Sequence, residues 1–83
     1  ALRRVRREQL LRNVCVALGN LGAPQALPSL RAALSDRHAL GRGHAAWALG
    51  RLGDHATLAA RLADESDTWV RDEISAALAT RRV

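Results

Sequence analysis

The 83-residue chain contains no lysine, methionine, phenylalanine or tyrosine, and its single cysteine is Cys15. One cysteine cannot form an intramolecular disulfide, and it cannot supply the ligands of a zinc or iron–sulfur site within these residues. Cys15 aligns with Ala46 and Ser75 of the repeats identified below, which favours a small packing side chain over a reactive thiol. Because Phe, Tyr and Met are absent and alanine and leucine are abundant, we expect the core to form by close approach of helices over alanine.

Long hydrophobic runs are also missing. No stretch of about 18 apolar residues and no signal peptide is present, which predicts a soluble, cytoplasmic protein without a membrane partner. The chain begins with Ala1, and its pattern opens part-way through a repeat. We therefore expect residues 1–83 to be a single domain and a fragment of a longer protein.

All thirteen basic residues are arginines, and they are unevenly distributed. Residues 1–31 contain six arginines against one acid, Glu8, whereas residues 32–83 contain seven arginines and seven acids. The net charge of +5 therefore lies at the N-terminal end. Genome composition explains part of the arginine bias, but guanidinium groups also suit bidentate phosphate recognition. This distribution predicts that a polyanion such as RNA is attracted to the N-terminal end.

One phrase occurs twice and begins a third time. The sequence ALGNLG of residues 17–22 returns as ALGRLG at residues 48–53, and residues 77–78 start it again. A period near 30 residues with a recurrent Leu-Gly-x-Leu-Gly break is typical of stacked helical hairpins. The predicted fold class is all-α, a right-handed α-solenoid of about two and a half hairpins. The repeats cover about residues 5–36, 37–65 and 66–83.

Apolar spacing predicts five helices and no strand. The helices cover about residues 5–18, a segment that Pro24 opens, residues 40–52, a short segment after the N-cap Asp54, and residues 68–80 with Ser66 or Asp67 as its cap. Glycines of the repeated phrase end the first and third helices. The predicted buried residues of the second and third helices are Leu27, Leu30, Leu34, Ala45, Ala48, Leu49 and Leu52.

Three phrases carry a resemblance to a known family: LRNVCVALGN at residues 11–20, ALPSL at 26–30 and HAAWALGRL at 44–52. They resemble HEAT-like repeats of the phycocyanobilin-lyase type, and most closely the C-terminal repeats of epoxyqueuosine reductase, over about residues 10–80. The resemblance implies a module that docks the anticodon arm of tRNA within an oxidoreductase of queuosine synthesis. It also implies that cobalamin and the 4Fe–4S clusters belong to upstream parts of that parent. No cofactor is expected in the present segment.

No catalytic set of residues is recognisable, because the three histidines lack ligand spacing and no serine has a paired base. The segment is therefore predicted not to be an enzyme, and the resemblance implies that the parent protein is an oxidoreductase. The candidate nucleic-acid-binding residues are Arg3, Arg4, Arg6, Arg7, Arg12, Asn13, Arg42, His44, Trp47 and Arg51.

Asn13 and His44 share a repeat register with Glu73, near helix starts that attract phosphate. A plain polar contact between repeats is the alternative interpretation. Trp47 is predicted to face away from its helix partner, which favours stacking on a base or docking on another domain. Wrapping of this ring by neighbouring repeats is the alternative. Trp69, which aligns with Leu40, is predicted to lie in the core between repeats.

Asp36 precedes Arg42 by six residues and Asp64 precedes Arg71 by seven, so each acid can meet an arginine at the start of the following helix or in the neighbouring repeat. Such pairs would form a ladder that holds successive repeats in register. Such partly buried pairs are costly to break, and anion binding is the alternative role. The last helix carries Ile74, Ala77 and Leu78 without a following partner, so we expect the isolated segment to self-associate.

Three functions remain open at this stage: RNA docking, a protein–protein scaffold, and a lyase-type or DNA-glycosylase-like repeat protein. Phosphate binding weakens steeply as salt rises, which distinguishes the first function from the second.

Overall fold

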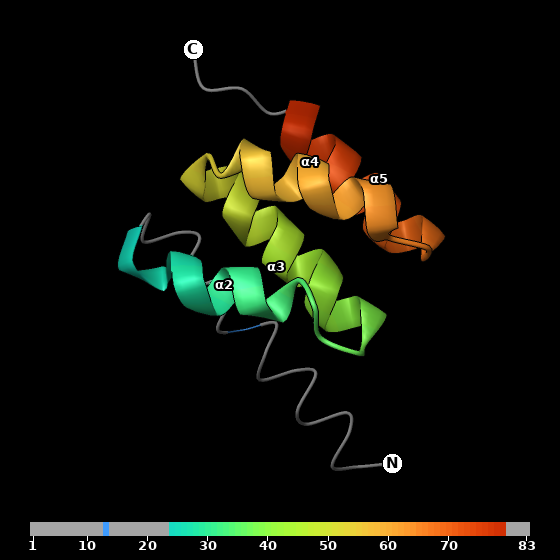
Figure 1. The fold of residues 1–83 in the computed structure, drawn as a ribbon, viewed down its shortest axis with the longest axis horizontal. Coiled ribbons are helices and arrows are strands. Elements are labelled where there is room, and N and C mark those ends of the chain that lie inside the picture. Colours follow the sequence, from blue (N-terminus) through green and yellow to red (C-terminus); the bar gives the residue numbers. More distant parts are fainter. Residues whose placement is uncertain (1–12, 14–23, 80–83) are drawn as a thin grey trace.

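The computed structural model describes residue 13 and residues 24–79, in which all regular structure is helical (Figure 1). The short 3-10 helix η1 (Pro24–Ala26) leads into α2 (Leu27–Ala33), which is followed by α3 (Ala39–Leu52), α4 (His55–Asp64) and α5 (Thr68–Ala79). The predicted all-α class is confirmed. Apart from Asn13, which is helical, the predicted first helix lies outside the described residues.

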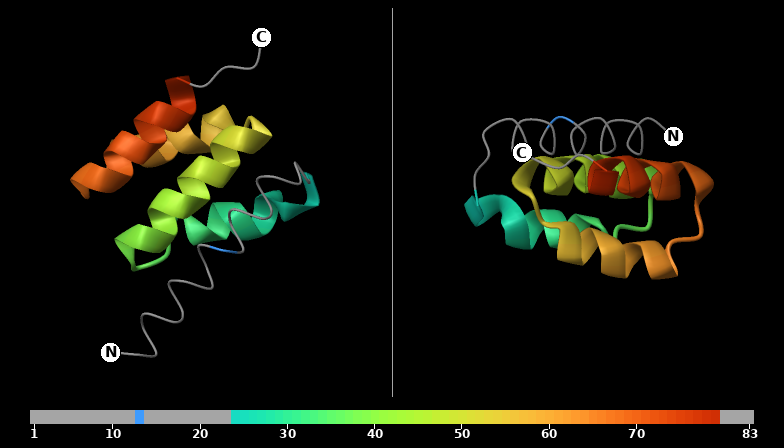
Figure 2. Two further views of the ribbon diagram at one scale, coloured as in Figure 1. Left: turned by 180° about the vertical axis from the view of Figure 1, so that it is seen from behind. Right: turned by 90° about the horizontal axis from the view of Figure 1, so that it is seen from above.

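The helices form two layers (Figure 2, right). Helices α3 and α5 lie side by side in one layer, and α2 and α4 form the other. Helix α3 packs against α2, α4 and α5, so it is the centre of the described structure. This arrangement is solenoid-like, because equivalent helices of successive hairpins stack in the same layer.

Helix boundaries follow local signals. Pro28 lies in the first turn of α2, where the missing N–H costs no helical hydrogen bond. Helix α3 ends at Gly53, which has a φ of 80° and whose N–H donates to the Gly50 carbonyl at 3.1 Å. Of the two predicted caps of α5, Asp67 is the one observed, because its Oδ1 accepts the Val70 N–H at 3.0 Å.

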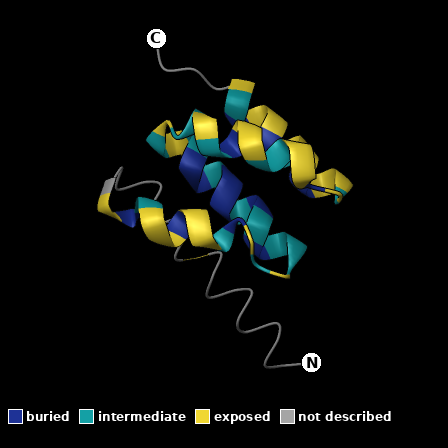
Figure 3. Cartoon of the chain, in the orientation of Figure 1, coloured by how far each residue is buried: buried dark blue, intermediate teal, exposed yellow. Residues whose placement is uncertain are grey.

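The core consists mainly of alanine and leucine, and its densest part lies along α3 (Figure 3). Helices α3 and α5 approach so closely that a Cβ added to Gly50 would lie 2.7 Å from the Ala77 Cβ. The prediction of a core built by close helix approach is therefore confirmed. The buried apolar residues are Ala26, Leu30, Leu34, Ala45, Ala46, Ala48, Leu49, Leu58, Val70, Ile74 and Ala77.

The apolar face expected on the last helix is already covered. Ile74 and Ala77 are buried, and Leu78 is half-buried against the same core. The expectation that these three side chains are left unpartnered is wrong, because α3 and α4 both pack against α5.

Candidate functional site

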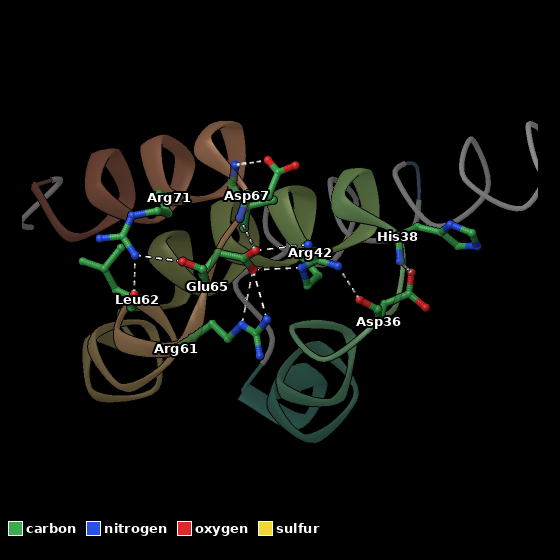
Figure 4. Close-up of polar contacts among 9 residues, drawn as sticks. Asp36, His38, Arg42, Arg61, Leu62, Glu65, Asp67 and Arg71 are labelled. Carbon is green, nitrogen blue, oxygen red and sulfur yellow. Dashed lines mark hydrogen bonds and ion pairs between the residues drawn. The ribbon is translucent and has the colours of Figure 1, made fainter.

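A single buried carboxylate joins three parts of the described chain (Figure 4). The Glu65 side chain is only 1% exposed and lies in the turn between α4 and α5. Arg42 of α3 binds it in a bidentate manner, with Nε 2.8 Å from Oε1 and Nη2 3.1 Å from Oε2. Arg61 of α4 donates to Oε1 at 3.1 Å, and the Asp67 N–H donates to Oε2 at 3.0 Å. We call these four residues the Glu65 clamp.

Electrostatics explain why this carboxylate is ionised. Burial raises the pKa of Glu65, but the hydrogen bonds from Arg42, the Asp67 N–H and Arg61 together outweigh it. The pKa of Glu65 consequently falls from 4.5 to about 2. The hydrogen bond to Glu65 likewise raises the pKa of Arg42, so the pair stays charged at neutral pH.

The observed partners of Arg42 and Arg71 differ from the acids predicted from the sequence. The carboxylate that binds Arg42 is Glu65, and Arg42 reaches Asp36 through the backbone carbonyl of that residue, at 2.9 Å. The predicted Asp64–Arg71 pair is wrong, because Arg71 Nη1 donates to the carbonyls of Leu62 and Glu65, each at 2.8 Å. Glu65 follows Asp64 directly in the sequence, and only the direction of the turn distinguishes the two acids.

A second ion pair links the helices of the other layer. Arg31 Nε of α2 lies 2.7 Å from Asp54 Oδ2, at the residue that precedes α4. Burial raises the pKa of Asp54, whereas hydrogen bonds with Arg31 and Thr57 lower it, and the net shift is downward. Both ion pairs therefore hold helices in place.

Three predicted site residues share one side of α3. The guanidinium of Arg51 lies 5.7 Å from the centroid of the Trp47 ring, one turn earlier on the helix. His44 lies a further turn toward the helix start, which places all three on one helical face. Trp47 is half-buried against the core rather than fully outward, and Arg51 is exposed.

The other candidate residues are placed as follows. Arg42 is occupied by the Glu65 clamp. Asn13 is helical and exposed. Five of the predicted basic residues lie outside the described part of the chain, namely Arg3, Arg4, Arg6, Arg7 and Arg12.

Trp69 is the residue that sequence reasoning misplaced. It was expected in the core, yet it is 40% exposed. Its ring lies directly over Gly43, where an added Cβ would overlap the indole, and its centroid is 5.8 Å from that of His44 in an edge-to-face arrangement. The absence of a side chain at Gly43 was the available signal, since it leaves space on α3 for a ring from the next hairpin.

Comparison with known families supports the repeat architecture directly. The family model described as HEAT repeats matches residues 1–79. The chain belongs to the HEAT repeat family. Comparisons of this HEAT repeat chain with curated proteins and with solved structures give no match. The coarser resemblance is thus confirmed, while the narrower one to epoxyqueuosine reductase gains no support.

Within residues 24–79 and Asn13, no three His, Cys, Asp or Glu side chains are grouped so that they could hold a metal ion. In the same part of the chain, no helix combines the length and apolar character needed to cross a membrane.

Proposed function

We propose that this HEAT repeat chain is a non-catalytic docking module that binds another protein. The observation that carries the proposal is that most of the described arginines bind acidic groups or carbonyls of the same chain. Residues 24–79 contain six arginines and seven acidic residues, so this part of the chain has no excess of positive charge. Three of the arginines bind carboxylates and a fourth binds backbone carbonyls: Arg31, Arg42, Arg61 and Arg71.

This use of arginine disfavours phosphate binding across residues 24–79. Affinity for nucleic acid comes mainly from cations that neutralise phosphates, and cations already paired within the protein contribute little. The exposed large hydrophobic side chain among the described residues is Trp69, and aromatic residues are enriched in protein interfaces. HEAT-like arrays commonly provide such interfaces.

A second candidate function is RNA docking through the N-terminal arginines. Residues 1–12 hold five arginines against Glu8, and the exposed Arg51 beside Trp47 could extend a basic surface. In this reading the partner is the anticodon arm of tRNA, and the parent is a cytoplasmic epoxyqueuosine reductase. The positive charge of the N-terminal residues and the resemblance of the sequence to epoxyqueuosine reductase repeats support RNA docking.

One experiment separates the two candidates. A photo-crosslinking amino acid is placed at Ala76, an exposed position on α5, and the adducts formed in the native cell are identified by mass spectrometry. Protein docking predicts protein adducts at this position. Adducts to RNA without protein adducts, or no adducts at all, would contradict the proposal.

RNA docking has its own test. It predicts micromolar binding of tRNA at low salt, with a log–log salt slope of about −0.7 to −0.9 per phosphate contacted. Replacement of Arg3, Arg4, Arg6 and Arg7 by glutamine should weaken that binding sharply. Unchanged binding in the quadruple variant would exclude the basic segment as the docking surface.

Self-association of the chain stays a prediction, but it loses its original physical basis. The side chains expected to drive it, Ile74 and Ala77, are buried within the chain. Sedimentation velocity at tens of micromolar protein tests the point, and a clean monomer would remove the prediction.

A further inference from the structure

Helix α5 presents a fixed aromatic ring to solvent. Trp69 is the one large hydrophobic side chain that is exposed among the residues described. The His44 ring meets it edge-to-face with an interplanar angle of 75°, and Gly43 lies beneath it. Because the ring is already held, little side-chain entropy is lost when a partner covers its exposed part. Tryptophan in this situation is a frequent centre of protein interfaces.

Two carboxylates follow the ring on the same face of α5. Asp72 and Glu73 come three and four residues after Trp69, a spacing that places side chains next to one another on a helix. Asp72 is exposed and Glu73 is half-buried. Within the described part of the chain, neither carboxylate forms a hydrogen bond or an ion pair. Their negative charge is therefore uncompensated by these residues.

On helix α3, a tryptophan is paired with an arginine of this chain that lies four residues later. There Trp47 is followed four residues later by Arg51, whose guanidinium lies over the ring. On α5 the residue four positions after Trp69 is Glu73, which has the opposite charge. Side chains on a helix lean toward its N-terminus, so Glu73 leans back toward the Trp69 ring. A carboxylate beside an aromatic face favours a cation over that face.

We propose that the α5 face formed by Trp69, Asp72 and Glu73 binds an arginine side chain of a partner protein. The guanidinium stacks on the exposed indole and pairs with the carboxylates, supplying from outside the cation that Arg51 supplies on α3. This inference rests on the proposed protein-docking function and defines the chemistry of the partner. RNA is a poor occupant of this face, because two carboxylates repel phosphate.

The test uses the full chain and a short arginine peptide, acetyl-Gly-Arg-Gly-Arg-Gly-amide. The indole N–H signals of the two tryptophans are followed by NMR, with Trp69→Phe assigning them. We expect a saturable shift of the Trp69 signal and an unchanged Trp47 signal. The double variant D72N/E73Q should weaken binding by about fivefold or more. Asp64→Asn, which removes an exposed carboxylate outside this face, should leave binding unchanged.

Several results would overturn the proposal. They are the absence of a Trp69 shift, an equal shift with the matching glutamate peptide, and undiminished binding by a D72N/E73Q variant that keeps its circular dichroism spectrum. A stronger Trp69 shift with an oligouridylate than with the arginine peptide would assign the face to RNA instead. Protein crosslinks from Ala76 without arginine-peptide binding would contradict only this inference. The absence of protein crosslinks from Ala76 would contradict the docking function itself.

Discussion

The Glu65 side chain connects three helices of this fold. Its carboxylate binds guanidinium groups from α3 and α4 and also the backbone at the start of α5. The cost of burying the charge is offset because every contact to it comes from a donor. Loss of this side chain would leave Arg42, which is also largely buried, without its counter-charge.

Replacing Glu65 with glutamine is therefore expected to lower the free energy of unfolding by about 3 kcal/mol or more, because breaking a buried pair strands its partner. Urea denaturation of the variant measures the loss. The neighbouring Asp64→Asn is the matched control and should change stability by less than about 0.5 kcal/mol, since Asp64 is exposed. Equal effects of the two substitutions would show that the Glu65 clamp contributes nothing.

The two tryptophans should differ in the stability they provide. Trp47 packs against the core but is only half-buried, so Trp47→Ala is expected to cost about 2 kcal/mol or more, against about 3–5 kcal/mol for a fully buried tryptophan. Trp69→Ala should cost less, because much of that ring is exposed. Thermal unfolding of the two variants compares them. A larger loss for Trp69→Ala would mean that its ring is a core residue after all.

At the scale of helices, the contact between α3 and α5 depends on the small residues at its centre. Gly50→Ala tests it, because helix propensity favours alanine by about 1 kcal/mol whereas overpacking costs about 1–3 kcal/mol. The new Cβ would lie 2.7 Å from the Ala77 Cβ and 3.2 Å from its Cα, so the helices must separate. We expect a net loss of stability.

A double-mutant cycle with Ala77→Gly provides the control for Gly50→Ala. If the two helices clash at this point, the double variant should be more stable than the sum of the single losses predicts. Urea denaturation of all four proteins gives the coupling. Additive losses, or a gain of stability in Gly50→Ala alone, would contradict close packing of α3 on α5.

At the scale of the whole molecule, the Glu65 clamp predicts how stability depends on pH. The pKa of Glu65 is about 2 in the folded chain against 4.5 in its ordinary state, so folding favours the ionised form. Its contribution is fully present above pH 4.5 and is lost as pH falls from there toward about 2. The lowered pKa of Asp54 acts in the same direction.

We therefore expect the urea midpoint to fall through this pH window, and to fall less in Glu65→Gln, which has no carboxyl group to titrate there. Denaturation curves collected from pH 6 to pH 2 provide the measurement. Parallel curves for the parent and the variant would show that other carboxylates control acid unfolding.

Local features of this protein could be predicted from its sequence. The end of α3 at Gly53, a cap of α5 at Ser66 or Asp67, and the buried Leu30 and Leu34 all followed from residues within one or two helical turns. The repeated Leu-Gly phrase likewise predicted stacked hairpins, and the family match agrees. Such features are accessible because helix periodicity and capping depend on short-range contacts.

Only the tertiary structure determines which side chains from separate helices meet and which remain exposed. Both Asp64 and Glu65 lie within reach of an arginine along the sequence, but the turn after α4 buries Glu65 and leaves Asp64 exposed. The rotation of α5 against α3 likewise sets Trp69 over Gly43 with one part in solvent, while it buries Ile74. Sequence spacing specifies which residues share a helical face, whereas the packing of whole helices determines what each face meets.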